Sequence, residues 1–108
     1  MAAMVVVQQG SIYWAELESE KGRPFLVLTR DRAIPVLSTV LVAPITRSMR
    51  SIPTEVALGE LEGLRFECAA TIDNVKTVPK AAFTRQIGSL DGGRWPEVCA
   101  AMRAAIDC

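Results

Sequence analysis

The sequence has no histidine, and this absence excludes several classes of enzyme. Among 108 residues there are no histidines and only three cysteines, at positions 68, 99 and 108. Histidine is the side chain whose ordinary pKa lies nearest neutrality, so Ser-His-Asp and Cys-His catalysis are both excluded. The cysteines are too widely spaced for a CxxC motif, which disfavours a zinc site and a disulfide framework. We therefore expect reduced thiols, no bound metal and no cofactor.

Long apolar runs are also missing. The longest cover residues 4–7 and 39–45, whereas a membrane-spanning helix needs roughly 20 consecutive apolar residues. The first ten residues lack the basic region that begins a secretory signal peptide. We expect a cytoplasmic protein without a membrane segment, folded as one domain over residues 1–108, since this length suits a single core.

Charge is balanced overall but unevenly distributed. Twelve basic residues offset twelve acidic ones. Residues 21–50 nevertheless carry six basic residues against one acidic residue, whereas residues 51–75 carry one basic residue against five acidic ones. Nine of the twelve cations are arginine, whose planar fork of donors suits phosphate. The basic block predicts either a binding site for a polyanion or a basic surface without that role.

Short apolar segments punctuated by single glycines and prolines predict β-strands separated by turns. The connections are too short for crossover helices, which favours an antiparallel barrel. The predicted strands are 11–17, 24–29, 39–45, 54–58, 68–72, 76–79 and 85–90, with a polar loop over 18–22 and a short helical turn ended by Pro35.

The C-terminal segment changes to helical periodicity. Val98, Met102 and Ile106 recur on one face, and Pro96 suits the first turn of a helix. This pattern predicts a helix that begins at Pro96, leaves Trp95 outside and packs on the barrel. The predicted fold class is therefore mainly β (α+β), an antiparallel β-barrel with a C-terminal α-helix.

Five segments occur in an order and spacing typical of one protein family. They are Gly10-Ser-Ile-Tyr-Trp-Ala, Lys21-Gly-Arg-Pro-Phe-Leu-Val-Leu, Ala43-Pro-Ile-Thr-Arg, Cys68-Ala-Ala-Thr-Ile-Asp-Asn and Thr77-Val-Pro-Lys. Together they resemble the MazF/PemK family of toxin endoribonucleases from bacterial toxin–antitoxin systems. The resemblance implies an SH3-like barrel, a homodimer, and metal-independent, sequence-specific cleavage of single-stranded RNA (mRNA). It also implies a cognate antitoxin whose acidic tail covers the active site.

The resemblance also implies which residues form the site. The arginine of the family's Arg-Pro motif falls on Arg23, and the threonine that ends its central strand falls on Thr46. An aspartate proposed as a base in some members falls on Asp73, beside Asn74. At Thr71 this sequence departs from members that have an arginine there, so no general acid is assigned.

These residue types suit RNA cleavage by the RNA's own 2′-hydroxyl. The guanidinium of Arg23 can stabilise the negative charge of the phosphorane, and the hydroxyl of Thr46 can donate to a phosphate oxygen. Asp73 can accept a proton, but Asp-Asn is equally typical of a turn. One of the adjacent strand residues Tyr13 and Trp14 should face the core. The further candidates for RNA binding are Tyr13, Trp14, Arg30, Arg47, Arg50, Asn74 and Lys80.

Two other functions remain open at this point. Gyrase-poisoning toxins share the barrel, but the resemblance implies a C-terminal Trp-Gly-Ile in that class, whereas this chain ends Ala105-Ile-Asp-Cys. A non-catalytic RNA-binding barrel is the second alternative. Fold does not separate the three functions, but an RNA cleavage assay with EDTA present does.

Overall fold

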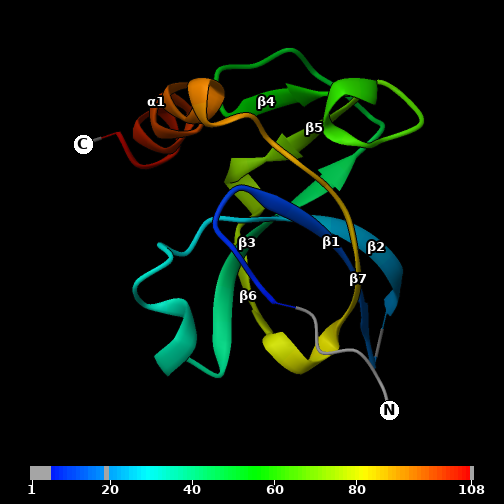
Figure 1. Cartoon of the computed structure of the whole chain (residues 1–108). Coiled ribbons are helices and arrows are strands. Elements are labelled where there is room, and N and C mark those ends of the chain that lie inside the picture. The colour runs from blue at the N-terminus through cyan, green and yellow to red at the C-terminus, as the bar shows by residue number, and fades with distance from the viewer. Residues whose placement is uncertain (1–5, 19, 108) are drawn as a thin grey trace.

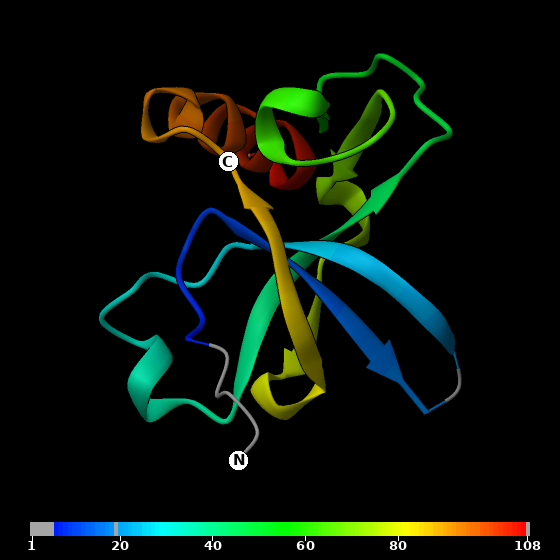
Figure 2. The same cartoon turned by 45° about the vertical axis from the view of Figure 1, so that its right-hand side comes forward.

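The computed structural model describes residues 6–18 and 20–107, apart from the side chain of Glu20, and shows a curled antiparallel sheet with one α-helix at its upper end (Figure 1; Figure 2). This confirms the predicted fold class. The strands are β1 (Ser11–Leu17), β2 (Glu20–Val27), β3 (Thr39–Thr46), β4 (Glu55–Leu58), β5 (Cys68–Thr71), β6 (Lys76–Pro79) and β7 (Phe83–Ser89), and the helix is α1 (Trp95–Ile106). The connections contain the 3-10 helices η1 (Ile34–Val36), η2 (Glu60–Glu62), η3 (Ile72–Asn74), η4 (Lys80–Ala82) and η5 (Gly92–Arg94).

The sequence predicted every one of these strands, and the errors lie at element ends. The predicted loop over 18–22 is too long, because β2 begins at Glu20 and pairs with Leu17 of β1. Trp95 is the first residue of α1, since its backbone adopts the right-handed helical conformation despite the proline that follows. Pro35 lies inside η1 instead of ending it, because the first turn of a helix tolerates proline. No helix in the described ranges is long and apolar enough to cross a bilayer.

β3 is the central strand because it pairs with three others. Its residues 39–42 pair with β6, and Ile45 and Thr46 pair with β5. Its other edge pairs with β2 over residues 42–44. The strand therefore connects an upper part of the sheet, with β4 and β5, to a lower part that contains β6 (Figure 1). Thr46, the last residue of β3, lies in the upper part.

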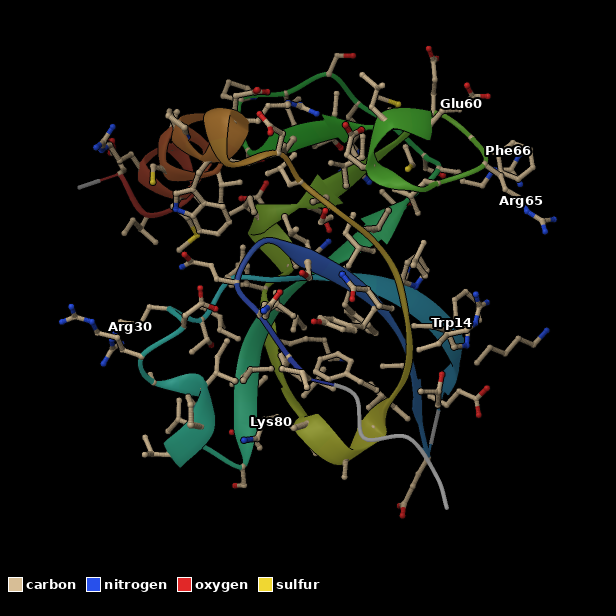
Figure 3. All side chains as sticks on the ribbon, viewed as in Figure 1. Trp14, Arg30, Glu60, Arg65, Phe66 and Lys80 are labelled. Atoms are coloured by element: carbon tan, nitrogen blue, oxygen red, sulfur yellow. The ribbon has the colours of Figure 1, made fainter. Side chains whose placement is uncertain are left out.

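Tyr13 and Trp14 point to opposite faces of β1, as predicted. Tyr13 is completely buried, with its ring centroid 5.1 Å from that of Phe83. Its hydroxyl donates to the carbonyl of Val6 over 2.7 Å and accepts from the amide of Gln8 over 3.0 Å. Trp14 instead projects from the right-hand side of the molecule (Figure 3). The prediction that Tyr13 contacts RNA is therefore wrong, because both its ring and its hydroxyl are used in the core.

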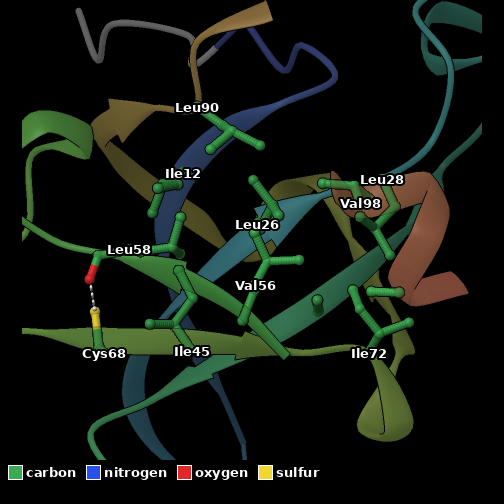
Figure 4. Packing of buried hydrophobic residues seen from close by; sticks show 13 residues of the cluster. Ile12, Leu26, Leu28, Ile45, Val56, Leu58, Cys68, Ile72, Leu90 and Val98 are labelled. Atoms are coloured by element: carbon green, nitrogen blue, oxygen red, sulfur yellow. Dashed lines mark hydrogen bonds between the residues drawn. The ribbon is translucent and has the colours of Figure 1, made fainter. Parts of the chain in front are cut away.

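Both faces of the sheet are buried, each in its own hydrophobic cluster. Leu26 and its neighbour on β1, Ile12, pack with Val98 of α1 in the upper cluster (Figure 4). Phe25 packs with Tyr13 in the lower cluster, beside β6 and β7. In the upper cluster the Cys68 thiol donates to the carbonyl of Leu58 over 3.7 Å. Burial, aided by the nearby Glu62 carboxylate, raises the pKa of Cys68, which keeps it a neutral thiol.

The loop that contains η2 is fixed to β7 by direct contact of the two backbones. A Cβ on Gly88 would lie 1.9 Å from the carbonyl oxygen of Glu62, so no side chain fits there. Gly63 has a φ of +93° and a Cβ on it would lie 2.5 Å from the carbonyl oxygen of Ile87. Two glycines therefore allow η2 to lie directly against β7.

Arg94 links the same loop to the start of α1. Its Nη1 lies 3.3 Å from a carboxylate oxygen of Glu62, which is only 6% exposed, and its Nη2 donates to the carbonyl of Ala57 over 2.7 Å. The other carboxylate oxygen of Glu62 accepts from the amide of Gly59 over 2.6 Å. Arg94 also donates two hydrogen bonds to Glu97, and these lower the pKa of that carboxyl.

Candidate functional site

Two adjoining clefts meet at Arg23, Thr46 and Ser48, which line both of them. The larger cleft, of 680 Å³, is called here the aromatic cleft, and the smaller one, of 390 Å³, the polar cleft. The aromatic cleft is further defined by Trp14, Arg47, Arg65, Phe66 and Arg85. The polar cleft is further defined by Arg50, Thr54, Glu55, Asp73, Asn74 and Lys76.

The Gly-Arg-Pro segment of β2 places Arg23 at this junction. Trp14 on β1 pairs with Pro24 and leans over Gly22, where an added Cβ would lie 2.3 Å from the indole nitrogen. Gly22 is therefore required for the indole to approach β2 this closely. Arg23, between them, pairs with Ala15 and lines both clefts.

Thr46 is held by the turn that follows β3. Its hydroxyl oxygen accepts a hydrogen bond of 3.1 Å from the amide of Ser48. This contact uses a lone pair and leaves the hydroxyl proton available to donate. The half-buried side chain thus combines a fixed position with a donor at the point where the clefts meet.

Asp73 and Asn74 reach the polar cleft from η3, immediately after β5. The exposed carboxylate of Asp73 accepts a hydrogen bond of 2.6 Å from the Thr54 hydroxyl through one of its oxygens. Its second oxygen takes no part in this contact. The polar cleft therefore brings together the three predicted catalytic residues, since Arg23 and Thr46 line it as well.

The loop between β3 and β4 supplies one arginine to each cleft. Arg47 lines the aromatic cleft and Arg50 the polar cleft. One carboxylate oxygen of Glu55 accepts from the amides of both Arg50 and Ser51, each over 2.9 Å. Ser51 has a φ of +53°, so Glu55 fixes an uncommon backbone turn that determines where Arg50 leaves the loop.

Three residues of the aromatic cleft were not predicted from the sequence. Arg65 and Phe66 belong to the loop after η2 and project from the upper right of the molecule, above Trp14 (Figure 3). The guanidinium carbon of Arg47 lies 4.0 Å from the ring centroid of Phe66. That of Arg85 lies 5.5 Å from the Trp14 ring. The cleft thus contains two aromatic rings, each covered by an arginine.

Two of the predicted RNA-binding residues lie away from both clefts. Arg30 is exposed on the left of the molecule, across from Trp14 (Figure 3). Lys80 lies at the lower end, where its ammonium group donates to the carbonyl of Ile34 over 2.8 Å. The structure therefore gives Lys80 a local contact with η1 and does not bring Arg30 to the site. The other predicted RNA-binding residues with exposed or half-buried side chains do line a cleft: Trp14, Arg47, Arg50 and Asn74.

The two clefts differ in charge. The aromatic cleft has four arginines and, among the described residues, no carboxylate or amide side chain in its lining. None of these arginines is in an ion pair with a described carboxylate. The polar cleft instead combines its basic residues with Glu55 and Asp73. Within the described ranges, no group of three or more Cys, Asp or Glu residues is arranged to hold a metal ion.

The chain is similar to known proteins over most of its length. Residues 8–106 match the family model for PemK-like, MazF-like toxins of type II toxin–antitoxin systems. "Probable endoribonuclease MazF5" of Mycobacterium tuberculosis is 35% identical over 101 residues, which cover 93% of each chain. "Endoribonuclease MazF3" of the same species is 38% identical over 96 residues, covering 89% of this chain and 91% of the relative.

A solved structure agrees with these sequence matches. The Mycobacterium tuberculosis toxin MazF-mt6 superposes with a TM-score of 0.83 and 38% identity, covering 90% of this chain and 96% of that one. The family match spans all the cleft residues and includes all seven strands and the whole of α1. Sequence, fold and coverage therefore agree that this chain belongs to the family of PemK-like, MazF-like toxins of type II toxin–antitoxin systems.

Proposed function

We propose that this chain is a toxin that cleaves single-stranded RNA, mRNA included, internally and at preferred sequences. One observation carries the proposal: Arg23, Thr46 and Asp73, from three separate elements, line one cleft that opens into an arginine-rich, aromatic one. The endoribonuclease names of the MazF relatives support it. Cleavage of mRNA in the cytoplasm would stop translation and growth.

The polar cleft supplies the groups that this reaction needs. The 2′-hydroxyl of the RNA attacks the adjacent phosphorus while Asp73 takes up its proton. Arg23 and Thr46 donate to the phosphate oxygens, on which negative charge increases in the phosphorane. The bond from phosphorus to the 5′-oxygen then breaks, that oxygen takes up a proton from water, and Asp73 returns its proton to the solvent. The products are a 2′,3′-cyclic phosphate and a 5′-hydroxyl. The RNA provides its own nucleophile, so the reaction requires no metal.

The aromatic cleft explains why the substrate is single-stranded. Trp14 and Phe66 are large rings at an open surface, with Phe66 53% exposed. Such rings stack on bases, and only unpaired bases present both faces for stacking. The four arginines around them attract the phosphate chain.

The test is RNA cleavage by the purified chain with EDTA present, followed by analysis of the product ends. We expect cuts that leave a 5′-hydroxyl and a cyclic phosphate, at a rate unchanged by EDTA. A 5′-phosphate or complete inhibition by EDTA would contradict the mechanism, and binding without any cleavage would favour the non-catalytic barrel. Binding should also weaken with salt, with a log–log slope of about −0.7 per neutralised phosphate.

We infer two protein partners as well, a second copy of the chain and a cognate antitoxin with an acidic tail. The family match supports both partners, and the arginines of the clefts complement an acidic tail. Light scattering at micromolar concentration should give twice the monomer mass. An acidic peptide should compete with RNA for the clefts, and its binding should weaken in the charge reversals Arg47→Glu and Arg50→Glu.

A further inference from the structure

The side chains of the aromatic cleft offer many hydrogen-bond donors and few acceptors. Its polar side chains are four arginines, the indole of Trp14, two hydroxyls and the Cys68 thiol, and none of its described lining residues is Asp, Glu, Asn or Gln. Guanidinium and indole groups donate hydrogen bonds and do not accept them. The hydroxyls of Thr46 and Ser48 can act in either direction, and Thr46 already accepts from a backbone amide.

This lining distinguishes bases by the groups on their edges. Uracil presents a carbonyl oxygen where cytosine presents an amino group, and guanine presents two adjacent acceptors where adenine presents one acceptor and one amino group. A cleft rich in donors satisfies the carbonyl of a keto base. The amino group of cytosine or adenine would face guanidinium groups that cannot accept from it. Leaving a polar group without a partner in this way lowers affinity.

The aromatic rings of the cleft provide surfaces for stacking, whereas Arg65 provides hydrogen-bond donors. Arg47 lies over Phe66 and Arg85 over Trp14, so these pairs form stacking surfaces. Arg23 is assigned to the scissile phosphate. Arg65 is the remaining cleft arginine, exposed on the same loop as Phe66 and so beside any base stacked on that ring. A single loop thus carries both the ring and the donor fork.

We infer that the aromatic cleft binds a keto base, uracil or guanine, beside the scissile phosphate, with Phe66 as its stacking surface and Arg65 as the residue that selects it. The inference rests on the proposed function, because it takes the occupant of the cleft to be RNA. The volume of 680 Å³ lies in the ordinary range for ligand sites, about 300–1,000 Å³. The buried Ile45 and the half-buried Leu64 and Ile87 add an apolar surface to this lining.

The experiment measures binding without cleavage, using 2′-deoxy oligomers of five uridines or five cytidines. These probes lack the attacking hydroxyl and differ only at the base edge. We expect the uridine oligomer to bind about tenfold more tightly than the cytidine oligomer. This is the discrimination between two bases that one well-placed charged hydrogen bond provides. Equal binding, or tighter binding of the cytidine oligomer, overturns the inference.

Variants separate base selection from general charge and from folding. Arg65→Gln should reduce the preference for uridine at least threefold, whereas Arg30→Gln, which removes the same charge outside the clefts, should leave it unchanged. Phe66→Leu should weaken both oligomers about tenfold, since stacking is lost for either base, with their ratio preserved. Leu61→Ala is the control for Phe66→Leu, because Leu61 is an apolar residue on the same loop that is 97% exposed. This control should change the affinity for neither oligomer. A preference retained in Arg65→Gln overturns the role of Arg65.

Sequencing of cleavage sites in random RNA completes the test. We expect uracil or guanine at one of the two positions that flank every strong cut. Cleavage with no base preference at either position contradicts the inference and leaves the proposed function standing. If the chain prefers the uridine oligomer but cuts no RNA, the inference about the keto base stands and the proposed nuclease function fails.

Discussion

The aromatic and polar clefts share three residues but are held together in different ways. In the aromatic cleft, the Phe66 loop is fixed to β7 through backbone contacts at Gly63 and Gly88, and the rings are covered by arginines. In the polar cleft, hydrogen bonds from Thr54 to Asp73 and from two amides to Glu55 hold the carboxylates. The difference matches the proposed function, in which the aromatic cleft binds the bases and the polar cleft orients the groups that transfer the proton.

Loss of a shared residue should have the largest effect. Arg23→Ala and Thr46→Ala should each lower the cleavage rate about 10²- to 10³-fold, because a fixed donor to the transition-state oxyanion is removed. Stability should change by only about 1 kcal/mol, since neither side chain belongs to the core clusters. Single-turnover rates and urea unfolding measure the two quantities.

Arg23→Lys is the matched variant for this prediction. It keeps the charge but loses the fork, so it should recover little activity. Full recovery by lysine would mean that charge alone is sufficient, and normal cleavage by Arg23→Ala would move the catalytic site elsewhere.

Asp73→Asn tests the polar cleft separately. Removing a proton acceptor should lower the rate about 10²-fold, while binding of a 2′-deoxy oligomer stays within twofold because the aromatic cleft is intact. Asparagine can still accept the hydrogen bond from Thr54, so the local fold should persist. A variant with an unchanged rate would restrict Asp73 to its role in the turn.

Gly88→Ala tests how the aromatic cleft is built. The new methyl group would overlap the carbonyl of Glu62, so the backbone must shift, at a cost of about 1–3 kcal/mol in the free energy of unfolding. Gly92→Ala is the control, since a Cβ there meets no atom within 4 Å. Urea denaturation compares the two variants. Equal free energies of unfolding for the two variants would show that the backbones of η2 and β7 do not contact each other closely.

Glu97→Gln should have the smallest effect and depend on pH. The pKa of Glu97 is lowered in the folded state, first by hydrogen bonds from Arg94. Its stabilising contribution is therefore present above the unfolded pKa, about 4.3, and is lost as pH falls through the folded pKa. Because Glu97 is 52% exposed, solvent screening limits the difference to about 0.5 kcal/mol at pH 7. Thermal unfolding of both proteins at pH 7 and at successively lower pH should show that the difference shrinks in acid.

The resemblance to the family predicted Arg23 and Thr46 as site residues from short motifs that need no tertiary structure. Both residues line the two clefts where they meet. Alternation along β1 showed that only one of its two aromatic residues faces the core, but the choice needed the sheet register. The same applies to Arg85, which reaches the site by pairing with Trp14 across strands far apart in the chain.

The sequence does contain a signal for Phe66. An aromatic residue that lies between Arg65 and Glu67 in a loop is poorly placed for a hydrophobic core, which favours a role at the surface. Arg30 and Lys80 illustrate another limit of the sequence, because neither lines a cleft. Positive charge favours contact with phosphate, but the position of a basic residue in the sequence does not show which side of the sheet it occupies.

The loop that carries Phe66 is anchored through its backbone, so its exposed side chains can be exchanged. Its backbone contacts β7 at two glycines, and the half-buried Leu64 packs against the upper cluster. The exposed side chains of Arg65, Phe66 and Glu67 can therefore be replaced while Arg23, Thr46 and Asp73 keep their positions. Under the proposed recognition of a base by Arg65 and Phe66, changes in three adjacent codons alter the target sequence while the two clefts keep their shared residues.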